Sequence, residues 1–141
     1  MIIFQVPALE AKNGDALFES NAIAYYVAND QLRGKTALEQ AQVVQWLSFS
    51  DNELLPSVLG WVFPTLNIID VPKQQVERSQ LDLQRALDVL NNVLLSKTYL
   101  VGERITLADI VVACSLLPAY QFVSTTRTQS AINNFFKGSR T

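Results

Sequence analysis

The stretch GERITLADI, residues 102–110, carries the clearest local signal in the chain. Thr106 is followed three residues later by Asp109, which is the spacing of a capping box with Asp in place of the usual Glu. The Asp109 carboxylate is expected to accept from the Thr106 N–H, and the Thr106 hydroxyl from the Asp109 N–H. An apolar run follows. We therefore favour a helix that begins here and packs into a core, and keep a catalytic role for Asp109 as the alternative.

Three helical segments are expected around this signal. The first covers about residues 37–63 and bends near Pro56, the second starts after Pro72, and the third is kinked at Pro118. Asp51 falls on the apolar stripe of the first segment, and we favour a position at the bend over a position in a cleft. The stripes of the first two segments are Val44, Leu47, Leu55, Val58 and Val62, then Val76, Leu83, Leu87, Leu90 and Leu94.

The first part of the chain is rich in β-formers and turn residues. Asn13-Gly14 separates two short apolar runs, which is the strongest short-range signal for a β-hairpin. Pro7 restricts the first run to an edge position or a strand end. The segment QLRGKT, residues 31–36, is interpreted as a linker whose last residue, Thr36, caps the next helix.

The segment ESNAIAYYVAND, residues 19–30, is predicted to be helical, with Ser20 or Asn21 as its N-cap. Helix N-termini also bind carboxylates through free N–H groups, and the Ser20 hydroxyl adds a donor. The Glu19 carboxylate, directly ahead, suits an ammonium group. Capping alone is the favoured interpretation, and a site for the two charged ends of an α-amino acid is the alternative. The two tyrosines of this segment are expected to pack.

Composition narrows the functional classes. The 141 residues are 49% apolar and 17% charged, enough for a packed domain, and a net charge of −2 argues against a surface that binds nucleic-acid phosphates. Histidine is absent, which excludes Ser-His-Asp triads and the common zinc sites. Cys114 is predicted to lie on the apolar side of the third helix and to be inert. Because no signal peptide or membrane span is predicted, we expect a cytoplasmic protein.

Several blocks resemble a known family. VPAL, LFESNAIAYYV and LVGERITLADI resemble cytosolic glutathione transferases. The longer blocks FESNAIAYYVAND, AQVVQWLSFSDNELLP, WVFPTL and TYLVGERITLADI are similar to the gamma-subunit branch of eukaryotic translation elongation factor 1. The likeness covers about residues 6–123. It implies a mainly α fold, in which residues 34–141 form a glutathione transferase C-terminal-like helical domain. Residues 1–33 would be a remnant of a thioredoxin-like N-terminal domain, a partial β-hairpin and a helix.

The resemblance also implies roles for particular residues. In glutathione transferases the proline matching Pro7 is cis, and the backbone beside it, at Val6 and Pro7, pairs with the cysteine of glutathione. The acid–serine pair matching Glu19 and Ser20 holds the γ-glutamyl end. The Thr106/Asp109 box is the structural N-capping motif of the family. No catalytic residue and no metal ligand are implied for this sequence.

The elongation factor branch implies a non-catalytic scaffold that anchors guanine-nucleotide exchange subunits during translational elongation. Valyl-tRNA synthetase is a further candidate partner, and neither nucleic acid nor membrane is contacted directly. The resemblance implies no cofactor. Glutathione, bound weakly, is the one candidate ligand. The alternative is a glutathione-dependent transferase. Such enzymes carry a thiol-activating residue in a strand–helix–strand unit ahead of the proline, and this sequence offers no counterpart.

Two expectations concern the ends of the chain. The short lead before Pro7 and the weak family match of residues 124–141 indicate a form truncated at both ends, or a partial gene model. The tail is expected to hold a short helix and then fray. A hairpin with one helix cannot bury enough surface to be stable alone, so apolar helix surface would be exposed. An unstable by-product without a role is the third alternative.

Overall fold

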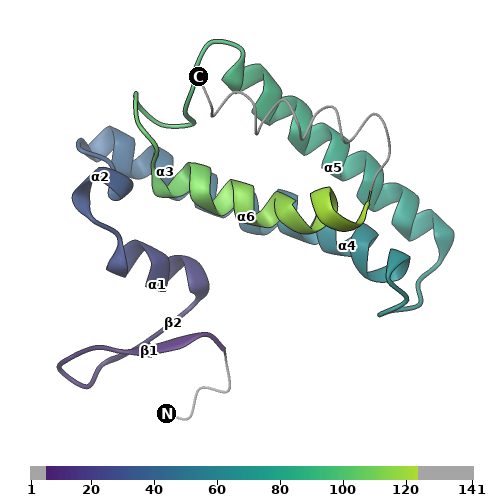
Figure 1. The fold of residues 1–141 in the computed structure, drawn as a ribbon, viewed down its shortest axis with the longest axis horizontal. Coiled ribbons are helices and arrows are strands. Elements are labelled where there is room, and N and C mark those ends of the chain that lie inside the picture. Colours follow the sequence, from purple (N-terminus) through teal and green to yellow (C-terminus); the bar gives the residue numbers. More distant parts are fainter. Residues whose placement is uncertain (1–5, 124–141) are drawn as a thin grey trace.

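A computed structural model of the chain describes residues 6–123 (Figure 1). A β-hairpin leads into two short helices, and four longer helices follow. In chain order the elements are β1 (Ala8–Glu10), β2 (Ala16–Phe18), α1 (Ser20–Val27), α2 (Asp30–Arg33), α3 (Ala37–Phe49), a π-helical turn (Ser50–Leu54), α4 (Leu55–Thr65), α5 (Lys73–Leu94) and α6 (Leu107–Phe122). The predicted tail helix lies outside the described residues. The mainly α fold class is confirmed.

The helices α3, α4, α5 and α6 form the body of the molecule and share one core. α6 lies along α3 and α4, and α5 packs against α4 (Figure 1). Each large side chain buried in this core contributes about 1.5–3 kcal/mol, so these four helices hold most of the stabilising free energy. The largest fully buried apolar side chains are Leu54, Leu83, Leu90, Leu116, Val43, Val58, Val62, Val101 and Val112.

The predicted stripe of the second long helix is confirmed, because Leu83, Leu87 and Leu90 are buried in α5 and its two outer members are half-buried. The stripe of the first helix is partly wrong. Val44 is 51% exposed, and its neighbour Val43 is fully buried.

The buried face of this segment runs through Val43, Leu47, Ser50, Leu54, Val58 and Val62. Leu47, Val58 and Val62 are therefore buried as predicted, whereas Val43 and Leu54 take the buried places that were predicted for Val44 and Leu55. The apolar pattern alone does not determine which edge of a wide stripe turns inward.

A π-helical turn lies where the bend near Pro56 was predicted, and it accounts for the position of Asp51. The Leu55 N–H donates to the Ser50 carbonyl, five residues back, which widens the helix by one residue. Pro56, which has no N–H to donate, follows directly in the first turn of α4. Ser50 takes the buried place and Asp51 is exposed. Asp51 thus lies in the π turn, at the place predicted for the bend.

The α6 helix contains Pro118 and corrects one prediction. It continues through Pro118 to Phe122 as one helix. Cys114 is exposed rather than on the buried side. The buried face carries Ser115 instead, whose hydroxyl oxygen lies 2.7 Å from that of Ser50 in the π turn. This buried polar pair joins α6 to the joint between α3 and α4, and each hydroxyl provides the partner that a buried polar group needs.

The hairpin is confirmed as predicted. Strands β1 and β2 are antiparallel, with Ala8 opposite Phe18 and Glu10 opposite Ala16. Gly14 has φ +86°, a conformation that glycine adopts without cost, which is why the turn forms at Asn13-Gly14. No residue of β1, β2 or α1 is buried, and this unit projects from the helical body (Figure 1). No helix in the described part of the chain is long and apolar enough to cross a membrane.

Candidate functional site

The four residues predicted to bind glutathione lie at one end of the hairpin. The ladder ends at the pair Ala8 and Phe18, so Pro7 precedes one strand directly where Glu19 follows the other. Val6 and Ser20 come next on the two sides. The Val6–Pro7 peptide bond is cis, as the resemblance implied. The fold thus brings together two segments that are twelve residues apart in sequence, and all four residues are exposed.

The helix start at Glu19 differs from the prediction. Ser20 is already the first residue of α1, and Glu19 holds the N-cap position without a side-chain capping bond. Glu19 has φ +72°, which costs a non-glycine residue of the order of 1–3 kcal/mol. Capping by the Glu19 side chain therefore does not explain this conformation. Within residues 6–123, the side chains of Glu19 and Ser20 have no hydrogen-bond partner.

Asn21 is not a cap either, and its side chain makes a contact that the sequence did not reveal. Its amide Nδ2 donates to Asp51 Oδ2 at 2.6 Å. The two residues are thirty positions apart, and the π turn places the Asp51 carboxylate where it meets the first turn of α1. The signal in the sequence was the unexpected carboxylate on an apolar stripe, but nothing in it named the partner.

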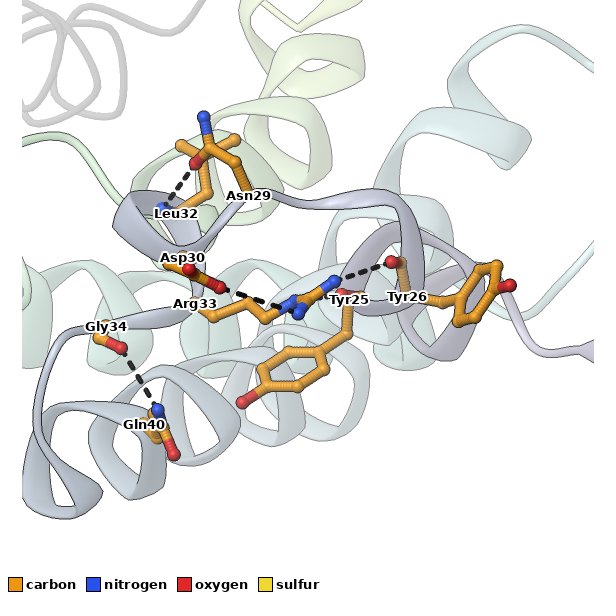
Figure 2. A network of polar contacts seen from close by, with 8 residues as sticks. All are labelled: Tyr25, Tyr26, Asn29, Asp30, Leu32, Arg33, Gly34 and Gln40. Atoms are coloured by element: carbon orange, nitrogen blue, oxygen red, sulfur yellow. Dashed lines mark hydrogen bonds and ion pairs between the residues drawn. The ribbon is translucent and has the colours of Figure 1, made fainter.

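The other end of α1 is held by Arg33 (Figure 2). The guanidinium Nε donates to the Tyr25 carbonyl at 2.8 Å and Nη2 to the Tyr26 carbonyl at 2.7 Å. These are carbonyls at the C-terminal end of α1, where intrahelical donors run out. Asp30 lies 3.8 Å from Nη1, and the guanidinium carbon is 5.8 Å from the centre of the Tyr25 ring.

Residues 31–33 were predicted to be linker, and they are part of α2 instead. The helix begins because the Asn29 side chain caps it, accepting from the Leu32 N–H at 3.0 Å (Figure 2). The predicted cap at Thr36 is confirmed, with its hydroxyl accepting from the Glu39 N–H at 3.1 Å. Of the two tyrosines, Tyr25 packs against the core as predicted, and Tyr26 is exposed.

The capping box at the start of α6 is confirmed, with both of its reciprocal contacts present. The Asp109 carboxylate accepts from the Thr106 N–H at 2.8 Å and the Thr106 hydroxyl at 3.1 Å. Its other oxygen accepts from the Leu100 N–H at 2.9 Å. With three protein donors around it, this carboxylate is occupied in holding the loop before α6. The structural interpretation of Asp109 is therefore favoured over the catalytic one.

Two surface cavities lie away from the hairpin end. One, of about 350 Å³, lies between the start of α3 and the loop before α6, and includes Lys35, Glu39 and Arg104. The other, of about 460 Å³, lies between the π turn and α5, and includes Glu53 and Arg78. Neither is lined by the predicted glutathione residues. In the described part of the chain, no three His, Cys, Asp or Glu side chains are grouped to hold a metal ion.

Comparison with known proteins agrees with this arrangement. A model of the glutathione S-transferase C-terminal domain matches residues 54–137, and a model of the N-terminal domain matches residues 2–29. The chain belongs to the glutathione S-transferase family. The match to the N-terminal domain covers the hairpin and α1, the unit that the resemblance assigned to a thioredoxin-like remnant.

Within the glutathione S-transferase family, the elongation factor resemblance is also confirmed. The chain is 56% identical over 119 residues to elongation factor 1-gamma of Artemia salina, and 51% identical over the same length to that of Homo sapiens. Each match covers 84% of this chain. The chain spans about 28% of the length of these relatives.

Solved structures give the same result. The GST-like domain of elongation factor 1-gamma from Saccharomyces cerevisiae superposes with a TM-score of 0.81 at 27% identity, covering 96% of this chain and 68% of that one. A possible glutathione S-transferase from Rhodopseudomonas palustris superposes with a TM-score of 0.78 at 29% identity, covering 94% of this chain and 62% of that one.

Proposed function

We propose that the chain acts in the cytoplasm as a non-catalytic scaffold of the elongation factor 1 complex, anchoring its guanine-nucleotide exchange subunits. The observation that carries this proposal is the identity of 51–56% to elongation factor 1-gamma from a crustacean, an amphibian and a mammal. Identity of this level along the helical body favours a shared partner surface over a shared fold alone. Valyl-tRNA synthetase is a further partner in this proposal.

Two observations support the non-catalytic part. Histidine is absent, and the candidate carboxylate of the α6 start is occupied by three donors. Several charges on the surface of α5 are also paired with one another. In α5, Arg78 and Arg85 both contact Asp82, and Lys73 pairs with Glu77. A face of this kind suits contact with another protein better than proton transfer.

We further propose that Val6, Pro7, Glu19 and Ser20 retain a site for the γ-glutamyl and cysteinyl parts of glutathione. The strained φ of Glu19 and the unpaired Ser20 hydroxyl support it. In this proposal residues 1–33 form the remnant that carries the site, and residues 34–141 form the helical domain that carries the partner surface. The two proposals can then be tested apart from each other.

Calorimetric titration of the chain with the N-terminal region of an exchange subunit tests the scaffold. It is run with and without glutathione, and in parallel with Glu19→Ala, which leaves the helical body unchanged. Saturable binding that is the same in all samples is the expected result. A folded chain that gives no heat with the exchange subunit overturns the scaffold proposal.

The glutathione site is tested by titrating glutathione alone into the chain and into Glu19→Ala. Weak binding that is lost in the variant is expected. Equal heats in both samples contradict the assigned site, whatever the outcome with the exchange subunit. Turnover of an electrophile by the chain would favour the transferase alternative.

A further inference from the structure

The turn of the hairpin holds a reactive pair that none of the roles above uses. Asn13-Gly14 is the only Asn-Gly pair in the sequence, and its residues are exposed at the tip of the turn. A Cβ added to Gly14 would meet nothing within 4 Å, so no side chain is packed against this side of the turn. That nitrogen is two bonds from the Asn13 Cα, within reach of the side-chain amide carbon of Asn13.

We propose that Asn13 is a site of spontaneous deamidation that loosens the hairpin as the protein ages. The Gly14 nitrogen attacks the Asn13 side-chain carbon and forms a new N–C bond. The bond to Nδ2 breaks, and that nitrogen leaves as ammonia with the proton that the Gly14 N–H gives up. Water then opens the five-membered imide on either side, which yields aspartate or isoaspartate. Water is the sole co-reactant.

The contacts of the turn govern the rate. The Gly14 N–H donates to the Ala11 carbonyl at 2.9 Å, and the Asp15 N–H donates to Asn13 Oδ1 at 3.2 Å. Both bonds must open before the nitrogen can attack, so the folded chain reacts more slowly than the unfolded one. Opening is accessible because the strands have three residues each and none is buried.

The same contacts make the product unfavourable for the hairpin. Asn13 Nδ2 donates to Asp15 Oδ2 at 2.6 Å, so deamidation replaces a hydrogen bond by two adjacent carboxylates. Isoaspartate also adds an atom to the backbone between β1 and β2. The bond from the Ala11 N–H to the Asp15 carbonyl, at 2.8 Å, then loses its alignment. Pro7 and Glu19 flank the two strands, so loosening of the hairpin would also disturb the proposed glutathione site. The deamidation proposal itself does not depend on that site.

Peptide mapping tests the reaction. The chain is incubated in mildly alkaline buffer, folded or in urea, and digested with trypsin, which releases the peptide between Lys12 and Arg33. Conversion of amide to acid at Asn13 is expected in both samples, faster in urea. Asn67, followed by the bulky Ile68, serves as the internal control that stays intact when folded. A folded chain with unmodified Asn13, at a time when the urea sample is converted, overturns the proposal.

Two variants separate the chemistry from its effect. Asn13→Gln removes the reaction and is expected to abolish the mass shift. Asn13→Asp supplies the charge of the product without the added backbone atom, and faster hydrogen exchange of the β1 and β2 amides is expected, with α5 unchanged. If exchange in Asn13→Asp and in the aged chain equals that of the fresh chain, the loosening is refuted even where deamidation occurs.

Discussion

The hairpin with α1 and the helical body are stabilised by different forces. No residue of β1, β2 or α1 is buried, whereas α3 to α6 enclose a continuous core around Leu54, Leu83 and Leu116. The first unit is joined to the body by the bond between Asn21 and Asp51 and by packing of Ala24 and Tyr25 against the core. Arg33 of α2 holds the other end of α1. Opening of the hairpin and α1 should therefore cost far less free energy than global unfolding.

The largest effect is expected from a pair of neighbouring leucines on α6. Leu116→Ala removes a fully buried side chain and should lower the free energy of unfolding by about 2–5 kcal/mol. Leu117→Ala, at a position 43% exposed, is the matched control and should cost far less. Chemical denaturation of both variants measures the difference. If both variants lose the same free energy of unfolding, Leu116 does not contribute to the core as its burial implies.

The capping carboxylate comes next. Asp109→Ala leaves the N–H groups of Leu100 and Thr106 without their acceptor, and should destabilise the body by about 2 kcal/mol. Asp109→Asn keeps one acceptor oxygen, so its stability should lie between those of Asp109→Ala and the wild type. Exposed Glu103→Ala controls for loss of a nearby charge. Thermal melts rank the stabilities of the three variants. An Asp109→Ala variant that is as stable as the wild type would contradict the structural interpretation of Asp109.

Arg33→Ala tests the joint itself. The substitution removes two hydrogen bonds to the C-terminal end of α1 and should lower the free energy of opening that helix by about 1.5 kcal/mol. The melting temperature of the helical body should not change. Hydrogen exchange of the α1 amides reports the opening. Arg33→Lys should not rescue, because one ammonium cannot replace the planar fork that reaches both carbonyls. Rescue by lysine would indicate that charge alone holds the helix.

Glu19→Gly should act in the opposite direction. Glycine adopts φ +72° freely, so the hairpin with α1 should gain about 1 kcal/mol, seen as slower hydrogen exchange in both elements. Glu19→Ala keeps the Cβ and should show no gain. If Glu19→Gly loses glutathione binding and gains this stability, the strained backbone at Glu19 is linked to the binding site. A destabilised Glu19→Gly would contradict the strain argument.

The smallest effect concerns the exposed bond between Asn21 and Asp51. Asn21→Ala should loosen α1 by about 0.5 kcal/mol. Exchanging the two residues, by Asn21→Asp with Asp51→Asn, reverses donor and acceptor and should restore wild-type hydrogen exchange in α1. It also places a carboxylate in the first turn of the helix, where the dipole favours it. If the exchanged pair behaves like Asn21→Ala, the contact does not position α1.

Signals that act over a few residues were predictable from the sequence. The hairpin at Asn13-Gly14, the cap at Thr36 and the box at Thr106 and Asp109 each depend on turn and capping chemistry within five residues. The irregular turn ahead of Pro56 is local as well, because proline lacks an N–H. The candidate site residues came from the family resemblance, and the fold places them at one end of the hairpin.

The tertiary structure alone decided what depends on partners distant in sequence. The inward edge of α3 and the exposure of Cys114 each depend on how helices stack, which a pattern with a wide apolar stripe leaves open. The contacts of Asn21 with Asp51, and of Ser50 with Ser115, join positions 30 and 65 residues apart. The sequence by itself determined where α3, α6 and the hairpin turn begin, because capping and turn bonds are short-range. Which faces meet was decided only when the packed core selected among nearly equivalent rotations of each helix.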